Sequence, residues 1–123
     1  MKEELTFGKY ISDKRKELQI TLRGMARTLD IAPAYLSDIE KGRRYPPDMG
    51  KLMQIASILK LTEDEKNKMF DLAGKDKNTI PPDLPEYIMS SEKVWVALRK
   101  AKDVATDKDW EEFVEKLNEK GGK

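Results

Sequence analysis

Residues 21–47 read TLRGMARTLDIAPAYLSDIEKGRRYPP, and the fold depends on how this stretch is arranged. Thr21 is a favourable N-cap residue, since its hydroxyl can accept a hydrogen bond from a free amide in the first turn of a helix. Apolar residues then recur at the three- and four-residue spacing of one helix face: Leu22, Met25, Ala26 and Leu29. The pattern predicts a short amphipathic helix that ends at Asp30.

A second short helix is expected after a three-residue turn. Asp30 tolerates the left-handed conformation that such a turn needs. Pro33 suits the first position of a helix, where its missing amide costs nothing. Leu36 and Ile39 then fall on one inward face, and Gly42 is a natural terminator. The stretch therefore predicts a helix-turn-helix, whose second helix enters the major groove of DNA.

The rest of the chain carries helical periodicity and no alternating strand pattern. We predict an all-α protein in which residues 1–74 form a five-helix domain, with Gly74 ending the fifth helix. Thr6, Asp48 and Thr62 are the expected caps of its first, fourth and fifth helices. Residues 75–85 are read as a polar linker stiffened by three prolines. Residues 86–123 are read as a short helical tail that begins with a turn near residues 85–89.

The 123-residue chain contains no Cys and no His. This composition excludes disulfides and cysteine nucleophiles, and it removes the commonest general base and the commonest metal ligand. The acidic runs at 63–65 and 107–112, like Ser90, Ser91 and Lys93, are read as helix starts. We therefore expect no enzyme activity, no cofactor and no bound metal.

Charge is distributed unevenly along the chain. The 24 basic and 23 acidic side chains nearly cancel, but residues 1–60 hold 12 basic and 8 acidic ones, and residues 61–123 hold 12 and 15. A basic front half permits a phosphate-facing surface on one side. The chain start has no signal-peptide pattern and no stretch is apolar over 18 residues, so we expect a cytoplasmic protein with no membrane segment.

Residues 6–73 resemble the Xre family of helix-turn-helix transcriptional regulators, the Cro and phage-repressor type. The run LSDIEKGRR at 36–44 is the most specific piece of the resemblance, together with LRGMA at 22–26. The resemblance implies a five-helix DNA-binding domain and a homodimer on a palindromic operator that controls transcription. It also implies an ion pair between Arg15, late in the first helix, and Glu40, before the glycine.

By the same resemblance, bases of double-stranded DNA would be read by the exposed face of the second helix of the motif. The positions are Ala32, Pro33, Ala34, Ser37 and Asp38, with Tyr35 nearby. None of them is the Arg, Asn or Gln that makes bidentate contacts to bases, and Leu22 stands where many phage repressors place a Gln. An alanine could meet a thymine methyl group, and Asp38 could accept from a cytosine amino group. We expect weak direct readout and more reliance on backbone contacts and DNA shape.

Contacts to phosphate have better candidates. Helix N-termini bind anions, which makes Thr21 and Arg23 at the start of the first helix of the motif suitable. A basic cluster follows the second helix: Lys41, Arg43, Arg44 and the hydroxyl of Tyr45. The alternative is an ordinary solvated loop.

The tail carries more large apolar residues than a spacer needs: Trp95, Trp110, Phe113, Val114 and Leu117. They could pair with a second copy, form a docking surface for another protein, or make a satellite core within one chain. Homodimerisation is favoured, because an operator-binding helix-turn-helix usually needs two copies about 34 Å apart.

Two other functions stay open beside repression. The chain could be an antitoxin that binds a toxin through its tail and its own promoter through the front. It could also be a protein-interaction module that keeps the fold without binding DNA. The resemblance further implies that a tailed regulator of this kind can be controlled by a partner metalloprotease.

Overall fold

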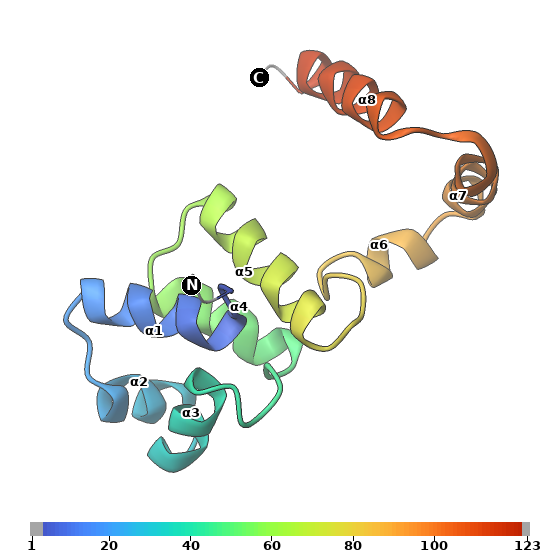
Figure 1. The fold of residues 1–123 in the computed structure, drawn as a ribbon. Coiled ribbons are helices and arrows are strands. Elements are labelled where there is room, and N and C mark those ends of the chain that lie inside the picture. Colours follow the sequence, from blue (N-terminus) through green and yellow to red (C-terminus); the bar gives the residue numbers. More distant parts are fainter. Residues whose placement is uncertain (1–3, 122–123) are drawn as a thin grey trace. The chain divides into compact units, whose positions relative to one another are not determined.

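The structure, a computed structural model, describes residues 4–121, which fold into eight helices without a strand (Figure 1). The chain divides after Pro85 into two compact units. The first unit holds α1 (Phe7–Glu17), α2 (Leu22–Leu29), α3 (Pro33–Glu40), α4 (Met49–Ile58) and α5 (Glu63–Asp76). The rest of the chain forms α6 (Pro85–Met89), α7 (Glu92–Val104) and α8 (Asp107–Lys120). The all-α prediction is confirmed. The prediction of a five-helix domain followed only by a short tail is wrong, because residues 85–120 form three further helices.

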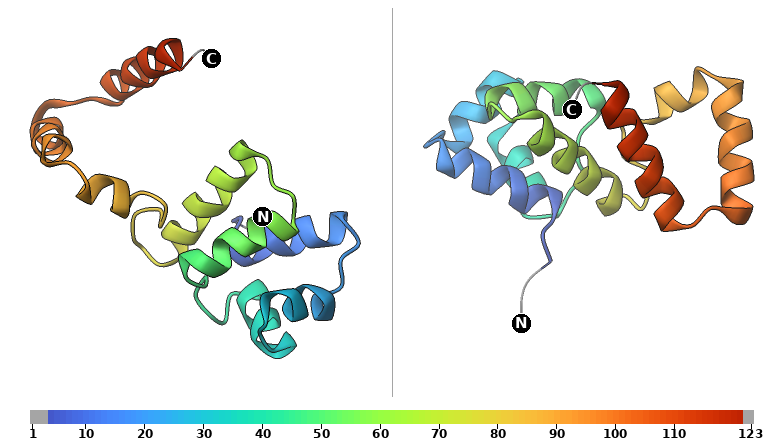
Figure 2. Two further views of the ribbon diagram at one scale, coloured as in Figure 1. Left: turned by 180° about the vertical axis from the view of Figure 1, so that it is seen from behind. Right: turned by 90° about the horizontal axis from the view of Figure 1, so that it is seen from above.

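Helices α1 to α5 enclose one hydrophobic core. α1 packs on α3 and α5, and α2 packs on α3 and α4, so α1 lies between α5 and the α2–α3 pair (Figures 1 and 2). Of the residues predicted on the inward faces of the motif helices, Leu22 is half-buried and the others are buried: Met25, Ala26, Leu29, Leu36 and Ile39. The later helices add further buried residues to the core: Leu52, Ile55, Ala56, Met69, Phe70, Leu72 and Ala73. Burial of these apolar side chains is the main source of stability for the five-helix arrangement.

All five helices of this unit end in the same way. One residue takes a positive φ, and the next amide donates to the carbonyl five residues back, which is the Schellman motif. The positive-φ residues are Gln19, Asp30, Gly42, Lys60 and Asn78. The hydrogen bonds are Ile20 to Arg15, Ile31 to Ala26, Arg43 to Asp38, Leu61 to Ala56 and Thr79 to Gly74. The roles predicted for Asp30 and Gly42 are confirmed, and the motif sets the direction in which the chain leaves each helix.

Gly74 does not end α5, contrary to the sequence prediction. The helix continues to Asp76, and Asn78 supplies the left-handed residue that terminates it. A Cβ on Gly74 would lie 2.8 Å from the Pro81 nitrogen and 2.9 Å from the Ile80 carbonyl carbon. The glycine therefore leaves room for residues 80–81 to fold back onto the helix. Its role is to permit this contact, and it does not terminate the helix.

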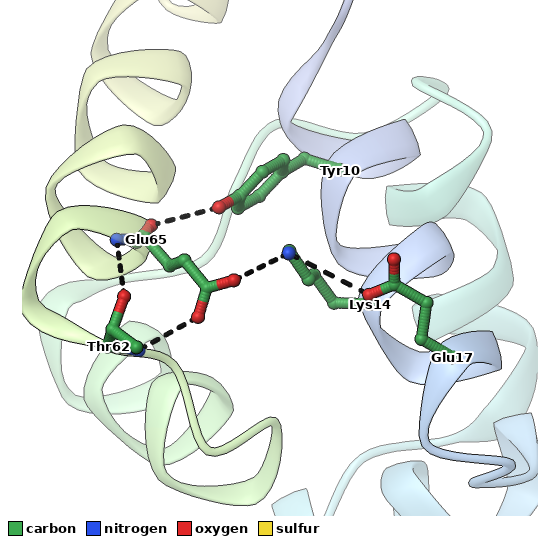
Figure 3. A network of polar contacts seen from close by, with 5 residues as sticks. All are labelled: Tyr10, Lys14, Glu17, Thr62 and Glu65. Carbon is green, nitrogen blue, oxygen red and sulfur yellow. Dashed lines mark hydrogen bonds and ion pairs between the residues drawn. The ribbon is translucent and has the colours of Figure 1, made fainter.

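A polar network fastens α1 to the start of α5 (Figure 3). Lys14 Nζ lies 2.6 Å from Glu65 Oε2, and the Tyr10 hydroxyl donates to the Glu65 carbonyl oxygen at 3.3 Å. Glu65 also forms a capping box with Thr62, the predicted N-cap of α5. The hydrogen bond from Lys14 lowers the pKa of Glu65, and the same bond raises the pKa of Lys14. One carboxylate thus caps α5 and joins it to α1.

The second unit is the smaller of the two. The Trp95 indole donates to the Ile88 carbonyl oxygen at 2.6 Å and ties α7 to α6. Trp110 and Phe113 meet edge to face, with ring centroids 6.2 Å apart. No residue of α6, α7 or α8 is buried. Across residues 4–121, none of the helices combines the length and apolar character needed to cross a membrane.

Candidate nucleic-acid interface

Helix α2, the first helix of the motif, is fixed at both ends. The Thr21 hydroxyl accepts from the Gly24 amide at 2.9 Å, which confirms Thr21 as the cap of α2. At the other end, Asp30 has φ 57° and ψ 47°, and Lys51 from α4 donates to the Leu29 carbonyl oxygen. A cation at that carbonyl also faces the negative end of the α2 dipole. Lys51 gave no sequence signal, because its partner is 22 residues earlier in the chain.

α3 is held against α1 by an ion pair. Arg15 Nε and Nη2 donate to the two Glu40 oxygens at 2.8 and 2.9 Å, and Nη1 donates to the Ile20 carbonyl at 2.9 Å. Both side chains are largely buried, at 10% and 8% exposure. The hydrogen bond to Glu40 raises the pKa of Arg15. The pair implied by the family resemblance is therefore present, and Glu40 together with the Ile20 carbonyl satisfies every guanidinium nitrogen of Arg15 inside the domain.

The outer face of α3 presents small side chains. Ala32, Pro33 and Ala34 are exposed at its start, where Ala32 is the N-cap and makes no side-chain cap bond. Tyr35 is exposed beside them, and Ser37 and Asp38 are half-buried one turn later. The face can approach DNA closely, but it offers few hydrogen-bonding groups to the edges of bases.

The basic cluster follows α3 directly and lies against it. Lys41, Arg43, Arg44 and Tyr45 are all exposed, whereas Pro46 is buried and anchors the loop. Arg43 Nη1 lies 3.7 Å from Asp38 Oδ1, and the Arg44 guanidinium carbon lies 5.7 Å from the centroid of the Tyr35 ring. Two residues expected to read bases are thus engaged with the two arginines expected to bind phosphate.

Lys77 is a further basic residue at this loop. Its Nζ lies 5.8 Å from the centroid of the Tyr45 ring. The sequence prediction missed it, because residue 77 falls in the predicted linker, whereas in the structure it is the C-cap of α5 and lies beside a loop more than 30 residues earlier in the chain. Lys77 adds a positive charge beside Tyr45.

The remaining predicted positions fall into two groups. Arg23 is exposed in the first turn of α2, next to the amides that an α-helix leaves without internal partners.

The apolar tail residues belong to the second unit, where Trp95 is half-buried and Trp110, Phe113, Val114 and Leu117 on α8 are exposed. The tail thus presents an apolar helix face.

Comparison with known proteins gives three similarities. A helix-turn-helix family profile matches residues 11–66. The ImmF control region 10 kDa protein of Bacillus phage phi105 is 43% identical over an alignment that covers 46% of this chain and 69% of that protein. Among solved structures, a chain of a SinR protein/SinI protein complex is similar with a TM-score of 0.47 and 19% identity, over 96% of this chain and 100% of that one.

Proposed function

Because the chain belongs to the Xre-type family of helix-turn-helix, DNA-binding transcription regulators, we propose that it is a repressor that binds a palindromic operator as a homodimer. The observation that carries this proposal is the continuous surface formed by α3 and the loop after it. The small side chains at the start of α3 would let this surface approach DNA closely. Lys41, Arg43 and Arg44 are exposed directly after the helix. The proposed activity needs no catalytic group, cofactor or metal, and it would be exercised in the cytoplasm.

Phosphate contacts supply most of the binding in this proposal. The motif and its loop, residues 21–47, hold five basic and three acidic side chains, and one of those acids is Glu40, which Arg15 neutralises inside the domain. The excess positive charge would face the DNA backbone and release counterions from it. The small residues at the start of α3 would then contribute apolar contacts and sensitivity to groove shape.

A second copy of the chain would bind through the tail. On α8, Trp110, Phe113, Val114 and Leu117 are between 41% and 52% exposed, and they recur at helical spacing. An apolar helix face of this kind is suited to packing against another helix. Two motifs joined in this way could reach half-sites one DNA turn apart, about 34 Å.

The same exposed face favours a second candidate function, that of a regulator whose tail binds a different protein. If the protein bound by the tail is a toxin, the chain would be an antitoxin. If it is a metalloprotease, the tail would be the part through which the regulator is controlled. Sedimentation of the purified chain separates the two proposals. Trp110→Ala should shift a monomer–dimer equilibrium towards monomer if a second copy is the occupant, and an unchanged equilibrium would favour another protein.

The DNA-binding surface is tested by removing its two arginines. Arg43→Ala with Arg44→Ala should weaken binding to every duplex and reduce the slope of log affinity against log salt by about 0.9 for each lost phosphate contact. Lys100→Ala with Lys102→Ala removes the same charge from exposed positions of α7 and serves as the control. A double arginine variant with the wild-type slope would contradict the proposed phosphate contacts.

A further inference from the structure

Arg43 and Arg44 are adjacent in sequence but are held by different chemistry. The partner of Arg43 is a carboxylate, since its Nη1 lies 3.7 Å from Asp38 Oδ1. The partner of Arg44 is a neutral ring, since its guanidinium carbon lies 5.7 Å from the Tyr35 centroid. Both partners belong to α3. The same helix therefore places a negative charge beside Arg43 and an uncharged aromatic ring beside Arg44.

The backbone brings Arg43 back to Asp38. Gly42 has φ 79°, and the Arg43 amide donates to the Asp38 carbonyl oxygen at 2.8 Å. This Schellman bond turns the chain so that residue 43 lies beside residue 38. The helix end therefore brings the Arg43 side chain within reach of the Asp38 carboxylate.

The pair is also open to solvent. The Arg43 side chain is 68% exposed and that of Asp38 is 36% exposed. An exposed ion pair is weak, because water and salt screen it. A DNA phosphate is an anion like Asp38, so the two would compete for the same guanidinium. The Tyr35 ring carries no charge and leaves the charge of Arg44 available.

We propose that Asp38 restrains Arg43 and thereby lowers the affinity of the protein for DNA of any sequence, while Tyr35 presents Arg44 in a form ready to bind phosphate. This inference rests on the proposed DNA-binding function. Sequence-independent binding comes almost entirely from phosphate contacts. A carboxylate placed on one of two phosphate-binding arginines therefore limits how strongly the regulator is retained on non-operator DNA.

The test measures binding of a random-sequence 30-base-pair duplex by fluorescence anisotropy over a series of KCl concentrations. Asp38→Asn should raise affinity about two- to fivefold, the range expected from an exposed ion pair. It should also steepen the salt slope by up to about 0.9, since one more phosphate contact forms. In an Arg43→Ala background the same substitution should give no gain. Asp71→Asn, which removes one exposed negative charge from α5, is the matched control and should leave affinity unchanged.

Three results would overturn the inference. An equal gain from Asp38→Asn with and without Arg43 would show that the carboxylate acts only by repelling DNA. No gain with Arg43 present would show that no restraint exists, and Asp38→Ser repeats this comparison in case the Asn variant is poorly folded. A wild-type protein that binds no duplex at any salt would overturn the proposed function itself, and this inference with it.

Discussion

Gly8 of α1 lies against the backbone of Glu40 in α3 so closely that a Cβ on the glycine would be 2.5 Å from the Glu40 carbonyl oxygen. The side chain of the same Glu40 accepts two hydrogen bonds from Arg15, two turns further along α1. α1 therefore fixes α3 twice, once by close approach of the backbones and once by a buried ion pair. α3 takes its position from these two contacts.

Gly8→Ala should destabilise the domain by about 2–3 kcal/mol, the usual cost of overpacking, because the neighbouring atoms are backbone and cannot rotate away. Urea denaturation followed by circular dichroism measures the change. Gly50→Ala in α4 is the matched control. Its Cβ would be 3.4 Å from an Asp48 side-chain oxygen, an ordinary contact, so the change should be neutral or stabilising by up to about 1 kcal/mol. Equal effects of the two alanines would contradict the close approach of α1 and α3.

Removing one member of the Arg15–Glu40 pair should be costly. Arg15→Met leaves the Glu40 carboxylate buried without its partner, and we expect a loss of about 3 kcal/mol. Glu40→Leu should cost a similar amount for the converse reason. The double variant removes both charges and should lose clearly less than the sum of the single losses. Denaturant midpoints of the four proteins give this comparison, and additive losses would mean that the two side chains do not interact.

Lys60 ends α4 with φ 53°, a conformation that costs an L-residue about 1–2 kcal/mol. Lys60→Gly removes that cost and adds some chain entropy to the unfolded state, so we expect a net gain of about 0.5–1 kcal/mol. Thermal unfolding should show a midpoint raised by a few degrees. Gln54→Gly, at an exposed interior position of α4, should lower stability by a similar amount. A lower midpoint for Lys60→Gly would show that the lysine side chain itself stabilises the helix end.

The Lys14–Glu65 contact predicts a pH dependence of stability. The folded pKa of Glu65 lies below its ordinary value of 4.5, so its contribution is fully present above that pH and is lost as pH falls through the folded pKa. The pKa of Lys14 lies above its ordinary 10.5, so the contribution is also lost at strongly alkaline pH. Glu65→Gln keeps a capping side chain but removes the charge. The stability difference from wild type should be largest near neutral pH and should vanish in acid, whereas a constant difference would point to the cap alone.

Helix starts and ends were largely predictable from neighbouring residues. Thr6, Thr21, Asp48 and Thr62 cap the helices as expected, and Asp30 takes the left-handed conformation predicted for the turn. Such features depend on hydrogen bonds between residues three to five positions apart, so the sequence contains both partners. The short α6 was read as a turn, because five residues are too few to show a helical period.

Most residues of the candidate interface could be named from the sequence, but Lys77 and the arrangement of the side chains could not. The sequence by itself determined that α2, the turn and α3 would form, and that a basic loop would follow. Only the tertiary structure decided that Arg43 meets Asp38, that Arg44 lies over Tyr35 and that Lys77 reaches Tyr45. It also decided that Gly74 lies inside a helix. The physical reason is that these contacts depend on the angle at which the chain leaves one helix and on the packing of segments that are distant in sequence. Neither the angle nor the packing produces a periodic or capping pattern in the sequence.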